Sequence, residues 1–88
     1  MARTLIHRTL PSFWETYEKL PVEVQELADK SFALLKVNPE HPSLHFKRVG
    51  SSWSARVGIS YRVLAVEEGS IFYWYWIGNH GEYDKRIG

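Results

Sequence analysis

The apolar residues between positions 11 and 37 recur every three or four residues, which is the period of an amphipathic helix. Pro11 and Pro21 each suit the first turn of a helix, because proline has no backbone N–H to lose there. The spacing therefore predicts a first helix over about residues 11–19. It predicts a second helix from residue 21 to near Asn38, since the residue before Pro39 is pushed out of the helical region.

From residue 44 onward the period changes from 3.6 to 2, which is typical of β-strands. Strands are expected over "LHFKRV", "WSARV", "YRVLAVE" and residues 71–77, with turns at "GSS", Gly58 and "EEGS". A short first strand is also expected, over residues 3–8. The chain is thus expected to be an α+β protein of order β-α-α-β-β-β, a small antiparallel sheet with a three-stranded meander. Its two N-terminal helices would pack on one face, and the first strand would join an edge.

The last predicted strand, "IFYWYWI", is apolar on both faces. Strict alternation places Phe72, Trp74 and Trp76 on one face and Ile71, Tyr73, Tyr75 and Ile77 on the other. Two helices can cover only one face of the sheet. The second face then needs cover from the C-terminal tail, from a partner, or from a ligand with flat apolar groups; a central strand covered on both sides within the monomer is an equal alternative. "GNHG" after this strand is expected to be a turn that leads into a polar tail.

The length, composition and net charge of the chain narrow the class of protein. Eighty-eight residues suit one domain over residues 1–88, and 44% hydrophobic content argues against global disorder. The absence of Cys excludes disulfides and thiolate chemistry, and together with the lack of a signal peptide or an apolar span it favours a cytoplasmic protein without a membrane partner. A net charge of +1 makes no broad electrostatic case for nucleic acid, but residues 43–66 hold four Lys and Arg and no acid.

The candidate chemistry gathers at the end of the last strand. In an antiparallel meander that end lies near Arg62 on the preceding strand, with Arg56 on the strand beyond. Arginine binds phosphate through a planar fork, and His80 can transfer a proton near neutral pH. Together these groups could cleave RNA without a metal or another cofactor.

Other sites are weaker candidates. His41 and His45 are four residues apart but lie in a proline-containing loop, so a metal pair is not favoured. Glu82 and Asp84 as a glycosidase pair would need a sugar-sized groove that nothing else in the sequence indicates.

The order "LHFKRV", "WSARVGISYRVLAV" and "IGNHGEYDK", behind a short strand and two helices, resembles the RelE/ParE superfamily of bacterial type II toxin-antitoxin toxins. The resemblance covers essentially the whole chain. The terminal segment is similar to the "G-x-H-x-x-Y-D" ending of RelE-like and HigB-like toxins. The resemblance implies an endoribonuclease that cleaves mRNA on the ribosome. It also implies a cognate antitoxin as partner, with a homodimer as the alternative when no partner is present.

The resemblance also implies roles for individual residues. Arg56, Arg62, His80 and Tyr83 would be catalytic, and His45, Lys47, Arg48 and Lys85 would bind RNA. Two departures keep alternatives open: the net charge is low for a ribosome binder, and Ser54 stands where some RNases of the superfamily have lysine. A ParE-like inhibitor of DNA gyrase and a non-catalytic antitoxin-binding descendant are the alternatives.

Overall fold

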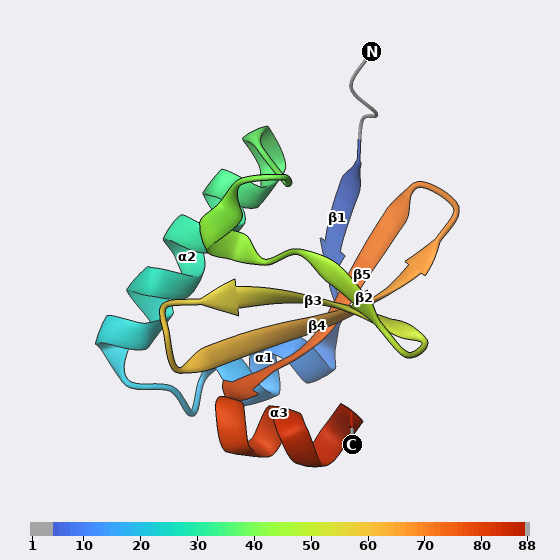
Figure 1. The fold of residues 1–88 in the computed structure, drawn as a ribbon. Helices are drawn as coiled ribbons and strands as arrows, with labels where there is room; N and C mark the ends of the chain where they lie inside the picture. The colour runs from blue at the N-terminus through green and yellow to red at the C-terminus, as the bar shows by residue number, and fades with distance from the viewer. Residues whose placement is uncertain (1–4, 88) are drawn as a thin grey trace.

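A computed structural model describes residues 5–87 and shows a five-stranded mixed sheet of order β1-β5-β4-β3-β2 (Figure 1). The strands are β1 (Ile6–Thr9), β2 (Lys47–Val49), β3 (Ser52–Val57), β4 (Tyr61–Glu68) and β5 (Ile71–Asn79). β1 pairs in parallel with β5, whereas β2 to β5 form an antiparallel meander of four strands. These are the four predicted strand segments, so the predicted order with a three-stranded meander counted one strand too few. The predicted edge position of the first strand is confirmed. Residues 3 and 4 of that expected strand lie outside the described residues.

Both predicted N-terminal helices are present, as α1 (Pro11–Tyr17) and α2 (Val22–Val37). A short 3-10 helix, η1 (Pro42–Leu44), follows α2 and replaces the expected start of the next strand at Leu44. His45 then adopts a left-handed conformation with φ of 45°, which a continuous strand does not allow. For that reason β2 begins only at Lys47.

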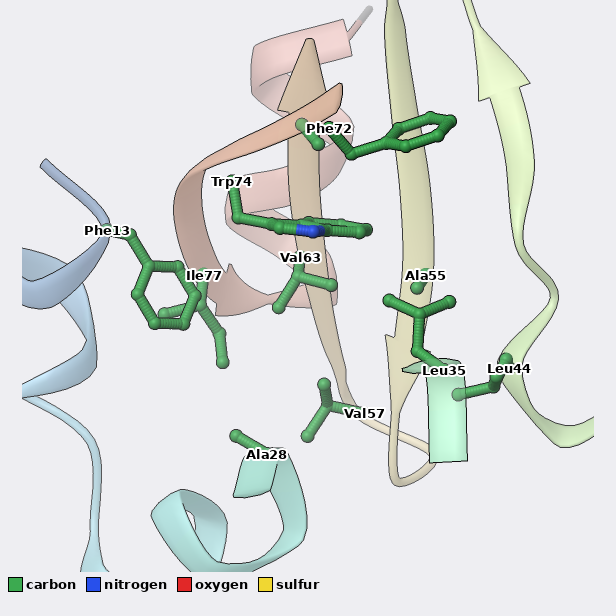
Figure 2. Close-up of a cluster of buried hydrophobic side chains, with 11 residues drawn as sticks. Phe13, Ala28, Leu35, Leu44, Ala55, Val57, Val63, Phe72, Trp74 and Ile77 are labelled. Atoms are coloured by element: carbon green, nitrogen blue, oxygen red, sulfur yellow. The ribbon is translucent and has the colours of Figure 1, made fainter. Parts of the chain in front are cut away.

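The main core lies between the sheet and these helices (Figure 2). Helices α1 and α2 contribute Phe13, Ala28 and Leu35, which pack against inward-facing residues of the sheet. The strands contribute Ala55, Val57, Val63, Ala65, Phe72, Trp74 and Ile77, and η1 adds Leu44. The buried residues of β3 and β4 therefore alternate with the period of 2 that the sequence predicted from residue 44 onward.

Helix α1 also completes the edge of β5 where β1 ends. The Ser12 hydroxyl donates to the Tyr75 carbonyl at 2.8 Å, and the Ile77 N–H donates to the Thr16 hydroxyl at 3.1 Å. Side chains of α1 thus replace a strand partner for this part of β5.

A β-bulge in β5 corrects the predicted alternation. Leu64 of β4 pairs with Trp76, but the next residue, Ala65, pairs with Trp74, so that Tyr75 is the extra residue. A bulge moves every later side chain to the opposite face. Trp76 consequently leaves the face of Trp74, and Ile77 enters the main core, the reverse of the strict period-2 prediction.

The second correction concerns the C-terminus, which forms a helix, α3 (His80–Ile87), rather than a turn and a tail. The Asn79 side chain caps it by accepting from the Glu82 N–H at 2.8 Å. Tyr83 of α3 packs with Leu64 and Trp76 on the outer face of the sheet, opposite α1 and α2 (Figure 1). The C-terminal segment is therefore one of the covers that the sequence required. Among residues 5–87, no helix combines the length and the apolar content that crossing a membrane would need.

Candidate active site

The site is built on an arginine pair. Arg56 of β3 and Arg62 of β4 are direct partners in the antiparallel ladder, and both alternate with inward-facing core residues. Arg62 is half-buried and donates from Nη1 to the Tyr61 carbonyl at 3.0 Å. The Nε of Arg56 is buried and has no hydrogen-bond partner in the described structure. Two cations that face each other across a ladder repel, and one of them has a donor to spare.

The start of α3 is held against the hairpin that carries the arginines. The His80 N–H donates to the Ser60 carbonyl in the β3–β4 loop at 2.8 Å. With Asn79 capping the helix, this bond fixes the first turn of α3 beside β4. Tyr83 is thereby placed next to Arg62, and His80 next to Tyr83.

Tyr83 lies at the centre of the cluster. The Cζ of Arg62 is 5.8 Å from the centroid of the Tyr83 ring, and the His80 ring is 6.1 Å from it at 81°. The Tyr83 side chain is only 6% exposed, and its hydroxyl donates to the Ser54 hydroxyl at 3.3 Å. The ring therefore separates and supports Arg62 and His80, while the hydroxyl points into the sheet.

His80 has a carboxylate partner, Asp84, which the sequence interpretation had considered only as a pair with Glu82. Its Nδ1 lies 3.1 Å from Oδ2 of Asp84, one helical turn along α3, and both side chains are about half exposed. When Nδ1 donates to this carboxylate, Nε2 is left as the proton acceptor. The i, i+4 spacing would have identified the pair if α3 had been predicted.

The surroundings of Arg62 lower the pKa of its guanidinium group. Burial, and then the like charge of Arg56, lower the pKa of Arg62, whereas Tyr83 and Asp84 oppose that change. Arginine stays protonated at neutral pH. The lowered pKa means that the local environment disfavours this positive charge, and an anion between the two guanidinium groups would relieve it.

The predicted RNA-binding residues are distributed unevenly. Lys47 pairs with Ser54 and shares the outer face with the arginines, and Lys85 is exposed on α3. Arg48 pairs with the inward-facing Trp53 and donates from Nε to the Gly50 carbonyl at 3.3 Å. His45 lies outside the strands. The fold therefore brings Arg56, Arg62, His80, Tyr83 and Lys47 to one face, but not Arg48 or His45.

Two hollows in the surface bear on the site, and neither contains both arginines and His80. One of about 320 Å³ borders Arg56 at the open edge of β3, between α2 and η1, and neither Arg62 nor His80 lines it. The larger, about 770 Å³, lies on the helical side of the sheet near the C-terminal end of α2, where Phe46, Trp53 and Phe72 line it. The arginine-histidine cluster itself is thus on an open surface. Within residues 5–87, no group of three His, Asp or Glu side chains is placed to hold a metal ion.

Solved structures of other proteins share this architecture. No protein-family model and no curated protein matches the sequence. Solved structures do match. The toxin in the RelB-RelE antitoxin-toxin complex from Methanococcus jannaschii superposes with a TM-score of 0.69 at 11% identity, over 91% of this chain and 98% of that one. The chain has the RelE-type fold.

Two further structures give the same result. A copper-bound mutant toxin from Helicobacter pylori has a TM-score of 0.68 at 14% identity, over 89% of this chain and 97% of that chain. A mutant of RelE from E. coli in the free state has a TM-score of 0.63 at 16% identity, over 98% and 100%. The RelE-type fold therefore spans nearly the whole length of each protein, and the predicted fold class is confirmed.

Proposed function

We propose that this chain is the toxin of a type II toxin-antitoxin system and a metal-independent endoribonuclease that cleaves mRNA on the ribosome. The observation that carries the proposal is the pairing of Arg56 with Arg62, next to a His80 that Tyr83 and Asp84 hold in place. The RelE-type fold supports it, because the similar solved structures are toxins.

The arrangement suits cleavage by the neighbouring 2′-hydroxyl. The 2′-oxygen loses its proton and attacks phosphorus, and the 5′-oxygen leaves with a proton, giving a 2′,3′-cyclic phosphate and a 5′-hydroxyl end. Arg56 and Arg62 would stabilise the negative charge that builds up on the phosphorane. His80, with Nδ1 held by Asp84, would transfer one of the two protons through Nε2.

An antitoxin is the proposed partner. One similar solved structure is a RelB-RelE complex and another is a RelBE complex from Mycobacterium tuberculosis. This chain has a groove of about 770 Å³ between α2 and the sheet, lined by Phe46, Trp53 and Phe72. An apolar segment of an antitoxin would find complementary surface there.

Expression in bacteria tests the proposal. The wild-type chain is expected to arrest growth, and toe-printing shortly after induction should show new mRNA ends. Arg62→Ala and His80→Ala should remove both effects, whereas Arg48→Ala, on the opposite face, should retain them. Circular dichroism shows whether each variant is folded. Arrest that persists in folded Arg62→Ala and His80→Ala would contradict the nuclease, and early loss of DNA supercoiling with intact mRNA would indicate a gyrase inhibitor instead.

A further inference from the structure

Helix α3 covers only part of the outer face of the sheet. Its Tyr83 and Arg86 lie over Leu64 and Trp76, which are near the middle of β4 and β5. Farther along the strands, Arg8, Tyr73 and Val66 are consecutive partners across β1, β5 and β4. Tyr73 is half-buried and Val66 is 38% exposed. An aromatic and aliphatic strip of the outer face is therefore open to solvent.

The bulge residue Tyr75 extends this strip. Its hydroxyl hydrogen-bonds with the Ser52 hydroxyl at 2.9 Å, although Tyr75 belongs to β5 and Ser52 to β3. Two strands that are separated by a third lie about 9–10 Å apart. To reach Ser52, the phenol must extend across β4, and Tyr75 remains partly exposed there.

Positive charges flank the flat rings. Arg8 sits beside Tyr73, Lys47 points outward from β2, and the Arg86 guanidinium lies 4.8 Å from the Trp76 ring. On the outward positions of the described strands, the acidic residue is Glu68, at the far end of β4; α3 adds Glu82 and Asp84 near His80. The strip is therefore apolar with cations at both sides.

We propose that Tyr73 and Tyr75 form a stacking platform for unpaired bases of single-stranded RNA, with Arg8 and Lys47 contacting its phosphates. This inference rests on the proposed function, because it supplies a binding surface for nucleotides that flank the scissile phosphate. Val66 lies four residues from Arg62 along β4, about 13 Å away. A purely apolar segment of a protein partner would leave Arg8 and Lys47 without a counter-charge, whereas a polynucleotide supplies both flat rings and phosphates.

Fluorescence anisotropy with the full chain tests the platform. The probe is a single-stranded 2′-O-methyl oligoribonucleotide, which cannot be cleaved because the attacking hydroxyl is blocked. Tyr73→Leu and Tyr75→Leu should each weaken binding by about five-fold or more, the loss of one stacked base. Tyr73→Phe, which keeps the ring, should bind like the wild type. Ser52→Ala should weaken binding because it frees the Tyr75 ring.

Salt dependence separates stacking from charge. The leucine variants should keep the wild-type slope of log affinity against log salt, while Arg8→Gln should reduce it by about 0.7. Equal affinity of folded wild-type and leucine variants would overturn the platform, as would equal binding of a blunt duplex or of an oligonucleotide with abasic positions. So would loss of antitoxin binding in Tyr73→Leu with RNA affinity unchanged, which would assign the strip to a protein partner.

The two proposals can fail separately. A chain that binds the oligonucleotide through both tyrosines but leaves mRNA intact would retain the platform and reject the nuclease. A chain that cleaves mRNA equally well with Tyr73→Leu and Tyr75→Leu, and binds the probe with unchanged affinity, would retain the nuclease and reject the platform.

Discussion

Arg56 and Arg62 lie directly opposite each other in the ladder between β3 and β4, on the face that also carries His80 and Tyr83. Like charges in this position destabilise a sheet, typically by a few tenths of a kcal/mol up to about 1 kcal/mol. Burial adds to the cost for Arg62. This is the pattern expected where charge is kept for binding an anion rather than for folding.

Removing one arginine should therefore separate stability from activity. Arg56→Gln is expected to leave the free energy of unfolding unchanged or to raise it by about 0.2–1 kcal/mol. RNA cleavage should fall by about 100-fold or more, because a charge that stabilises the transition state is lost. Urea unfolding and a cleavage assay measure the two effects, with Arg48→Gln as the control. Undiminished cleavage in Arg56→Gln would remove this residue from the site.

The Trp76 indole leaves no room for a side chain at position 78. A Cβ at position 78 would lie 2.2 Å from Cζ2 of Trp76, so Gly78→Ala must displace that ring, which also carries Arg86. We expect a loss of about 1–3 kcal/mol in the free energy of unfolding. The matched control is Gly81→Ala in α3, where the nearest atom is 3.4 Å away. That change should stabilise by about 0.5–1 kcal/mol, because alanine favours a helix. Similar effects of the two changes in thermal unfolding would disprove the close contact.

His7 should make stability depend on pH. Its Nδ1 accepts from the Trp74 indole at 3.0 Å, and its Nε2 is buried without a hydrogen-bond partner among residues 5–87. Burial, followed by the charge of Lys36, lowers the pKa of His7. Below about pH 6.5 the unfolded chain binds the proton more readily than the folded chain does. This contribution to stability is therefore present above that pH and is lost as the pH falls.

Replacing His7 with a neutral acceptor tests that linkage. His7→Gln should unfold with a smaller difference in stability between pH 7.5 and pH 5 than the wild-type chain shows, as measured by urea denaturation at both pH values. An identical pH dependence in the two proteins would show that His7 does not contribute.

The Tyr83 hydroxyl distinguishes a structural role from a catalytic one. It donates to Ser54, a buried polar residue of the outer face. Tyr83→Phe should cost about 1 kcal/mol of stability, because Ser54 loses its partner, and it should leave the cleavage rate nearly unchanged. The double variant with Ser54→Ala should recover part of that stability. A large loss of cleavage in folded Tyr83→Phe would instead give the hydroxyl a direct part in proton transfer.

The sequence alone determined the elements whose periodicity is long and unbroken. Both N-terminal helices, the inward alternation of β3 and β4, and the edge position of the first strand could be predicted, because each follows from local spacing and short connections. The polar composition after Asn79 led to the prediction of a turn and a tail in place of α3. Asn79, with Glu82 three residues later, is nevertheless a helix start signal. The sequence named Arg56, Arg62 and His80 as candidate site residues, but it could not give the distances between them.

Only the tertiary structure decided where the faces of β5 change over. The bulge at Tyr75 lets the strand meet β4, α1 and α3 at once, which no local pattern specifies. The bulge directs Ile77 into the core and Trp76 toward α3, and the Tyr75 side chain extends across β4 to Ser52. The physical reason is that a single inserted residue reverses the side of every later side chain, and its position depends on the packing of partners distant in sequence.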